Sequence, residues 1–546
     1  MPASFNIKAN LVDLKNKAIY PAEVVVSHGK ISRISRIPES EIREHGFMMP
    51  GFVDAHIHIE SAMLIPSEFA RMAVVHGTVA TISDPHEIAN VMGMEGIEYM
   101  INNGNKVPFK FYFGAPSCVP ATNFETAGAE ITADDIRTLL KRDEIKYLAE
   151  MMNWPGVLFE DPDVMEKIKI AHELKKPVDG HAPGLKGDKA TKYIQAGITT
   201  DHECTSEDEA RHKLENGMKI QIREGSAAHN FDALVGLARH HADQMMFCSD
   251  DKHPHELQHG HINQLVKRAI EQDVDLFDAL DMASSNVISH YNLEVGKLTV
   301  GDPADFIMVE DLKDFNVLRT YIDGKLVAEN GKSLIETVPE KCINKFNITY
   351  LEESAFKLKP KSDKINVVVA FDGELITEKL TTDCLTIDNN VVSDVKNDIL
   401  KYTVVNRYVE SHPAIGFIKN LGLKKGAIAC SVAHDSHNIV AVGVDDASIC
   451  KAVNLLVDAK GGLAIYTDEE VAVLPLPVAG LMTNEDAYKV AEQYQKLLDK
   501  TKVLGSTMHD PFMTLSFMAL LVIPSIKLSD KGLFDGEKFQ FIDVFA

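Results

Sequence analysis

Two histidines two residues apart, His56 and His58, close a short apolar run that begins at a Pro50-Gly51 turn. In a β-strand, residues i and i+2 point to the same face, so both imidazoles can aim at one point at the strand's end. Imidazole is a common ligand of Zn²⁺, Fe²⁺ and Mn²⁺. An isolated His-x-His is more often an ordinary pair of polar residues. A metal site therefore depends on partners supplied elsewhere in the chain.

Several further apolar runs typical of β-strands follow and make eight strands with the first one, and several end in residues that can bind a metal. These seven runs are residues 78–82, 109–113, 147–151, 177–181, 198–202, 219–223 and 245–250. These end residues are Glu150, His181, His202 with Glu203, and Asp250 with Asp251. Each of them taken alone is better explained as a loop or helix-cap residue. Their common position after successive strands instead favours one shared site of imidazoles and carboxylates.

The elements that would position these side chains alternate along residues 50–290. Helices are expected at 163–175 and 188–196, between the strand runs. Alternating strands and helices predict a parallel sheet, and eight strands predict a closed (β/α)8 TIM-like barrel of the α/β class. In such barrels the active site lies at the carboxyl ends of the strands, where the histidines and carboxylates fall.

The segments on either side of the barrel carry short strands that cannot bury an apolar face alone. A hairpin is expected around residues 27–29, and turn-strand units at 301–309 and 317–327. We therefore expect residues 1–49 and 291–340 to form one small composite β-sandwich, with the barrel inserted between them. Residues 345–546 are expected to form an additional C-terminal α+β domain.

Composition narrows the class of protein. The formal net charge of -24 argues against nucleic acid as a partner, because phosphate binding requires basic patches. The sequence has no apolar run of about 18 residues, so no membrane span is expected. The first 17 residues lack the pattern of a signal peptide. Seven scattered cysteines are typical of reduced thiols, so a cytoplasmic protein acting on a small molecule is expected.

The motifs point to one family. Pro-Gly-Phe-Val-Asp-Ala-His-Ile-His at 50–58 resembles the first-strand signature of the amidohydrolase superfamily. Other segments resemble the adenine deaminase family built on this barrel, and together they span nearly the whole chain. They are residues 55–61, 83–90, 250–254, 426–439, 474–482 and 523–533.

The resemblance implies a dinuclear centre of two divalent ions, Mn²⁺ or Fe²⁺, with Zn²⁺ as a third option. On the matching positions, His56, His58 and Asp250 hold one ion. His181 and His202 hold the second, and Glu150 bridges the pair. Mixed imidazole and carboxylate ligands suit all three metals, so ligand type does not choose among them.

The implied reaction is the hydrolytic deamination of adenine to hypoxanthine and ammonia in purine salvage, by a metal-bridging hydroxide, in a homo-oligomeric enzyme. One rival is a related amidohydrolase that acts on another purine or on a cyclic amide or amidine. Glu150 favours the deaminase, because the superfamily's hydrolases often bridge their metals with a carboxylated lysine. The other rival is a non-catalytic metal-binding relative, against which the intact ligand set argues.

Two carboxylates are the candidate catalytic groups. Asp250 is expected to take a proton from the attacking water and pass it to the leaving amine, while Glu203 donates to N1 of the ring. Adjacent residues of a strand point to opposite faces, so Glu203 reaches the ring only if the strand has ended before it.

Four residues near the strand ends are candidates for substrate binding: Glu60, Ser61, His86 and His253. His86 has the alternative of capping the helix that follows it. The other histidines of residues 253–261 are expected on a solvated helix face. The segment His434-Asp435-Ser436-His437 shows no sign of a hydrolytic triad, so it is expected to be a loop near the barrel mouth or a neighbouring subunit.

Overall fold

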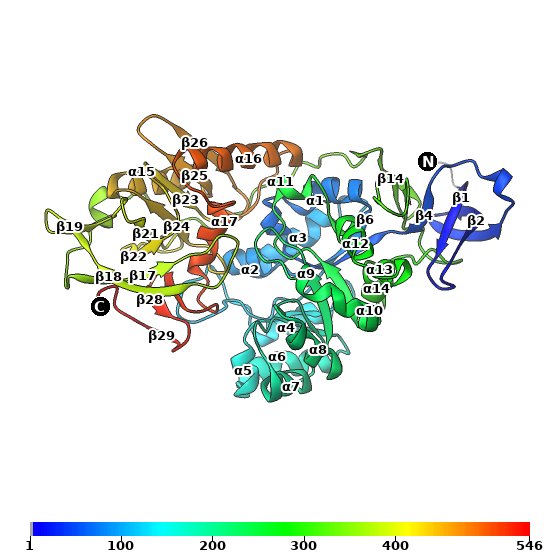
Figure 1. Cartoon of the computed structure of the whole chain (residues 1–546), viewed down its shortest axis with the longest axis horizontal. Coiled ribbons are helices and arrows are strands. Elements are labelled where there is room, and N and C mark those ends of the chain that lie inside the picture. Colours follow the sequence, from blue (N-terminus) through cyan, green and yellow to red (C-terminus); the bar gives the residue numbers. More distant parts are fainter. Residues whose placement is uncertain (1–3) are drawn as a thin grey trace.

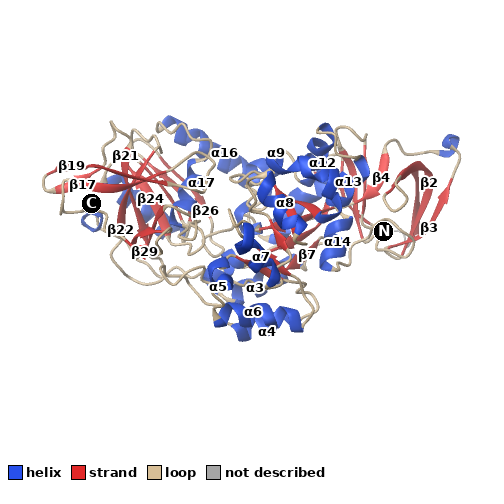
Figure 2. Cartoon of the chain, turned by 60° about the horizontal axis from the view of Figure 1, so that its bottom comes forward, coloured by secondary structure: helices blue, strands red, loops and turns tan. Residues whose placement is uncertain are grey.

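A computed structural model describes residues 4–546 of the chain. The barrel lies in the middle of an elongated molecule, with the N-terminal sheet at one end and the C-terminal domain at the other (Figure 1). Figure 2 shows the same order from a second direction. Residues 1–3, the start of the predicted segment 1–49, lie outside the described residues.

Eight short strands form the barrel, as the sequence predicts. They are β5 (Phe52–Ile57), β6 (Thr78–Ser83), β7 (Lys110–Phe113), β8 (Leu148–Met151), β9 (Val178–Gly180), β10 (Thr200–Asp201), β11 (Lys219–Arg223) and β12 (Met245–Cys248). Ladders β5-β6-β7, β8-β9 and β10-β11-β12 are parallel. Bridges between Ala115 and Leu148 and between Ile57 and Asp250 join neighbouring ladders, and the second one closes the ring. The α/β barrel prediction is therefore confirmed.

Helices cover the outside of the barrel and connect its strands. The predicted helices at 163–175 and 188–196 correspond to α6 (Pro162–Glu173) and α7 (Gly187–Gln195). Asp161 caps α6, because its carboxylate accepts hydrogen bonds from the amides of Asp163 and Val164. The strands are short and almost entirely buried, so barrel stability depends on the apolar layer between strands and helices rather than on long ladders.

Strands from both sides of the barrel hydrogen-bond into one eight-stranded sheet, in the order β16-β15-β14-β13-β4-β1-β2-β3. They are β1 (Ser4–Asp13), β2 (Ala18–Ser27), β3 (Lys30–Arg36), β4 (Phe47–Pro50), β13 (Phe306–Val309), β14 (Val317–Ile322), β15 (Lys325–Glu329) and β16 (Lys332–Ser333). The junction is the antiparallel pair of β4 and β13. Both halves share one apolar core, in which Phe306 stacks on Tyr321. The exact domain boundaries stay a prediction.

The C-terminal part contains a second eight-stranded sheet, in the order β18-β17-β22-β21-β24-β23-β25-β26. Two of its strands lie where buried strands are expected at 366–370 and 440–444: β17 (Lys364–Val369) and β24 (Ile439–Gly443). Helix α15 (Asp446–Ala459) packs on this sheet, and α16 (Ala487–Val503) lies against the barrel helix α11 (Pro254–Leu257). The barrel mouth therefore faces the C-terminal domain.

Within residues 4–546, no helix combines the length and the apolar character needed to cross a bilayer. All seven cysteines carry free thiols.

Candidate active site

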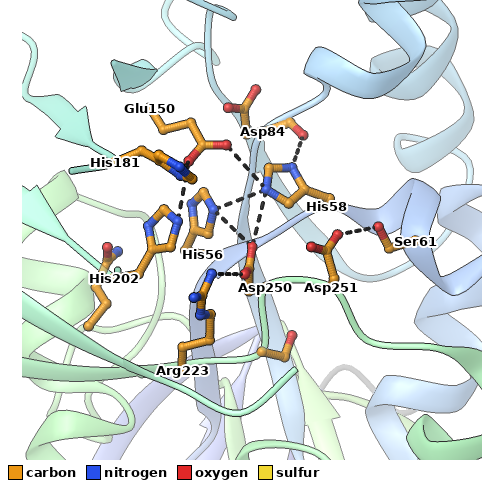
Figure 3. A network of polar contacts seen from close by, with 12 residues as sticks. His56, His58, Ser61, Asp84, Glu150, His181, His202, Arg223, Asp250 and Asp251 are labelled. Atoms are coloured by element: carbon orange, nitrogen blue, oxygen red, sulfur yellow. Dashed lines mark hydrogen bonds and ion pairs between the residues drawn. The ribbon is translucent and has the colours of Figure 1, made fainter. Parts of the chain in front are cut away.

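The two histidines of the first barrel strand lie side by side. His56 is in β5, and His58 comes directly after it. Their Nε2 atoms are 3.2 Å apart (Figure 3). The Nδ1 of His58 lies 3.2 Å from the carbonyl oxygen of Asp84. Only the protonated nitrogen can donate to that carbonyl, so the lone pair of Nε2 faces the centre, as a metal ligand requires.

Asp250 follows β12, the strand that closes the ring beside β5, and its side chain reaches the same point. Its amide donates to the carbonyl of His56, and its own carbonyl accepts from the amide of His58. Asp250 has a φ of 54°, in the left-handed region that most residues avoid. This conformation places Oδ1 3.5 Å from His56 Nε2 and 3.3 Å from His58 Nε2.

Glu150, on β8, lies between two groups of imidazoles. One carboxylate oxygen, Oε1, is 3.4 Å from His58 Nε2. The other, Oε2, is 2.9 Å from His181 Nδ1 and 3.3 Å from His202 Nε2. Glu150 is therefore the one carboxylate in this cluster that contacts both histidine groups, which is the position of a bridging ligand.

A buried ion pair positions the loops after β9 and β10. Asp201 Oδ1 accepts hydrogen bonds from the amides of Ala182 and Glu203, the residues that follow His181 and His202. Its Oδ2 accepts from Lys213 Nζ at 2.5 Å, and both side chains are fully buried. Because one carboxylate holds both loops, the two histidines are fixed relative to each other.

These donor atoms fit divalent ions. Ligand atoms about 2.1 Å from one ion lie about 3.0–3.4 Å apart at octahedral to tetrahedral angles. The spacings of the six predicted ligands fall between 2.9 and 3.5 Å. Sets of three or four such atoms gather around more than one point. The site is thus a His/Asp/Glu cluster that can hold metal, whereas the role of each ligand stays a prediction.

The electrostatics of the cluster favour added positive charge. Burial opposes protonation of His58, yet the Asp250 and Glu150 carboxylates raise its pKa well above the usual value. Burial likewise opposes ionisation of Glu150, yet the surrounding histidines hold its pKa well below normal. Both shifts mean that the buried carboxylates stabilise positive charge in the cluster, and a bound cation would supply that charge when the imidazoles act as neutral ligands.

Arg223, at the end of β11, joins the two candidate catalytic carboxylates. Its Nη1 lies 2.5 Å from Glu203 Oε1 and 2.6 Å from Asp250 Oδ2, and Nη2 lies 3.0 Å from Glu203 Oε2. Burial would raise the pKa of Glu203, but the Arg223 guanidinium holds it well below its usual range. Glu203 faces the site because β10 ends at Asp201, so the strict alternation of a strand no longer applies.

The pocket above the cluster has walls from two parts of the chain. Barrel side chains form its floor, and the C-terminal domain supplies apolar and polar residues. The contributions of the C-terminal domain are Leu375, His434, Asp435, Phe517, Leu520 and Val522.

The four predicted substrate residues separate into two groups. His86 lines the pocket, with Nδ1 3.4 Å from Glu150 Oε1, and it also begins α2 (His86–Met92). Glu60 and Ser61 lie behind the wall. Glu60 accepts from the amide of Ile88, and Ser61 donates to the pocket residue Asp251 at 2.5 Å.

His253 does not line this pocket, and the structure gives no support to substrate contact there. Its Nδ1 lies 3.2 Å from Asp510 in the C-terminal domain. Of the other three histidines expected on a solvated helix face, His259 is exposed, but the expectation is wrong for His255 and His261. His255 is buried against Tyr494 of α16, and His261 is buried beside Asp54 at 2.9 Å. Sequence periodicity could not show that α16 covers this surface.

Two features of the pocket were missed from the sequence: the residue Arg223 and the distant contacts of Glu87. Arg223 ends a predicted strand, and that position was the available signal. Glu87 contacts His434 and His437, which lie 347 and 350 residues further along the chain, so no local pattern indicates the contact.

The barrel with metal-ligand residues at its strand ends is the arrangement of the amidohydrolase family, and the model of that family matches residues 47–327. A second family model, the adenine deaminase C-terminal domain, matches residues 374–540.

Full-length relatives agree with both matches. An adenine deaminase of Salinibacter ruber is 53% identical over 100% of both chains. One of a Sulfurovum species is 54% identical over 98% of this chain and 99% of the relative. One of Methanosarcina mazei is 50% identical over 98% of both. The chain belongs to the adenine deaminase family.

Proposed function

We propose that this chain catalyses the hydrolytic deamination of adenine to hypoxanthine and ammonia, as a step of purine salvage. The observation that carries the proposal is a His/carboxylate cluster with Glu150 between two histidine groups, at the floor of a small pocket. Family membership supports the substrate, since relatives matched over their whole length are named adenine deaminases.

Two divalent ions are part of this proposal, Mn²⁺ or Fe²⁺, with Zn²⁺ as the third option. His56, His58 and Asp250 would hold one, and His181 and His202 the other. Glu150 would contribute one oxygen to each. When bound, such ions act as Lewis acids and make water acidic enough to serve as a nucleophile near neutral pH.

Asp250 is the proposed proton carrier between water and the leaving group. Arg223 and two histidines hold the pKa of Asp250 well below its usual value against the effect of burial, so the carboxylate is ionised and can accept a proton. It takes the proton that remains on the oxygen attached to C6 and transfers it to N6. The C6–N6 bond then breaks, ammonia leaves, and C6 becomes a carbonyl.

Glu203 is the proposed source of the proton on N1. Arg223 keeps this carboxylate ionised at rest. Glu203 therefore has to collect the proton released when water becomes the nucleophile, and it transfers this proton to N1 as the ring loses aromaticity. General acid-base groups of this kind contribute roughly 10²- to 10⁴-fold to rate.

The expected cytoplasmic location and the homo-oligomeric state stay predictions. Free thiols on all seven cysteines suit a reducing compartment.

The test is the loss of adenine's ultraviolet absorbance together with ammonia release, using protein produced with added manganese. Turnover of adenine without turnover of adenosine is the expected result. Metal-loaded protein that leaves adenine unchanged would overturn the assignment in favour of other cyclic amidines and amides.

A further inference from the structure

A segment of the C-terminal domain enters the pocket and is fixed there by the barrel. Residues 431–438 connect β23 (Ala427–Cys430) to β24. His434 Nδ1 lies 2.5 Å from Glu87 Oε1, and His437 Nε2 contacts Glu87 Oε2. Because His437 Nδ1 accepts from the amide of Ala433, its Nε2 carries the proton and donates to Glu87. One barrel carboxylate thus clamps both histidines of the segment.

Asp435 lies between these two histidines and faces the pocket. Its side chain is buried, with 3% exposure, and it lines the same pocket as His58 and Glu150. Oδ1 is 3.9 Å from His86 Nε2. Oδ2 is buried and has no hydrogen-bond partner among residues 4–546. A buried carboxylate oxygen without a partner is costly, so a donor in the pocket is expected.

The other pocket carboxylates already have partners. Glu87 is used by the clamp, and Glu150 by the histidine groups. Glu203 and Asp250 pair with Arg223, and Asp251 accepts from Ser61. Within the described chain, Asp435 is therefore the pocket carboxylate with a buried oxygen available to a ligand.

We propose, on the basis of the proposed function, that Asp435 accepts a hydrogen bond from the N–H of adenine's five-membered ring and so restricts the enzyme to the free base. With C6 at the metal cluster, that ring points away from Glu150. The imidazole of His86 lies between Glu150 and Asp435, with contacts of 3.4 and 3.9 Å to their carboxylates.

The proposal gives the C-terminal domain a direct part in specificity. A nucleoside has a sugar in place of the N9 hydrogen, so it offers no donor and brings bulk against a buried carboxylate. The neighbouring walls, Leu520 and Val522, are apolar and cannot replace the lost hydrogen bond. Glu87 acts as a positioning residue, because it reaches the substrate only through the segment that it holds.

The experiment compares adenine with its 9-thia analogue, in which sulfur replaces N9–H, so that the donor is lost with little added bulk. The substitution is Asp435→Ala. In the unchanged enzyme, kcat/KM for adenine should exceed that for the analogue by about 10- to 100-fold, the range of a hydrogen bond to a charged group. In the variant this preference should fall to within about 3-fold, mainly through a higher KM for adenine.

Three controls make the outcome decisive. Asp435→Asn keeps the side-chain volume and should give an intermediate preference, which also covers misfolding of the alanine variant. Asp281→Asn changes a half-buried carboxyl of α13 (Leu276–Met282), outside the pocket and without contact to the segment that carries Asp435; burial raises its pKa above the usual value, and adenine turnover should stay unchanged. Metal content should match the unchanged enzyme in all variants.

A variant at Asp435 that keeps the full preference, or that loses metal, would overturn the proposal while the deaminase assignment stands. If the unchanged enzyme does not act on adenine at all, the proposed function falls first, and this inference falls with it.

Discussion

Arg223 offers a sharp test of how the site is held together. Its side chain has 6% exposure and forms three contacts of 2.5 to 3.0 Å with two carboxylates that are equally buried. Replacing it with methionine keeps much of the apolar volume but leaves the carboxylates of Glu203 and Asp250 without their cation. Removing one partner of a buried ion pair costs about 3–5 kcal/mol, because the remaining charge stays buried and unpaired.

That cost should appear as a large fall in melting temperature. At about 2–4 °C per kcal/mol, Arg223→Met should lower the midpoint by roughly 6–20 °C. The assay is calorimetry of metal-loaded protein. Midpoints are compared rather than free energies, because unfolding of several domains need not be two-state.

The matched control is Arg268→Met. Arg268 also bridges two carboxylates, Glu224 at 2.6 Å and Asp232 at 3.2 Å, but its side chain has 32% exposure. An exposed pair of this kind contributes about 1 kcal/mol or less, so a fall of a few degrees is expected. Equal midpoints for the two variants would refute the reasoning, because burial would then not decide the cost. Arg223→Lys should fall between them, since an ammonium cannot form the bidentate contact.

Three further predictions follow from the site and its surroundings. Asp250→Asn should lower kcat for adenine by roughly 10²- to 10⁴-fold, measured as ammonia release; a loss of less than about 3-fold would remove Asp250 from proton transfer. Chelation should abolish turnover and lower the melting temperature, with recovery on adding Mn²⁺ or Fe²⁺, while elemental analysis should find fewer ions per chain in His202→Ala than in a His212→Ala control. Burial lowers the pKa of Lys527 to about 7, so above that pH the unfolded chain binds more protons and stability rises with pH. Between pH 7 and 9 the unchanged protein should gain about 2 kcal/mol over Lys527→Met; parallel melting profiles of the two proteins would contradict this.

The barrel could be predicted because most of its strands fall in short, largely apolar segments that alternate with helical stretches. The observed strands Thr78–Ser83 and Lys219–Arg223 match the predicted runs to within a residue. The strand ends then placed the six candidate ligands on one rim without any structural knowledge. Whether the Glu203 side chain faces the site could not be predicted, because this depends on β10 being only two residues long.

Contacts between distant parts of the chain could not be predicted from the sequence. Burial of His255 depends on Tyr494. The segment with Asp435 was expected near the barrel mouth or a neighbouring subunit, but its orientation into the pocket depends on Glu87. In both cases the partner belongs to another domain, and neither residue lies in a periodic pattern that signals the contact. Hydrophobic periodicity reports which face of an element is buried, but not which element buries it.

The shared sheet at the N-terminal end has a consequence for synthesis. Strand β4 ends at Pro50, but its antiparallel partner β13 begins only at Phe306. With translation at about 5–20 residues per second, roughly 250 intervening residues take on the order of 10–50 s. During that time the edge of β4 has no strand to pair with, and an open edge is a template for pairing with other chains. We therefore expect the nascent chain to need shielding at β4 until the whole barrel has left the ribosome.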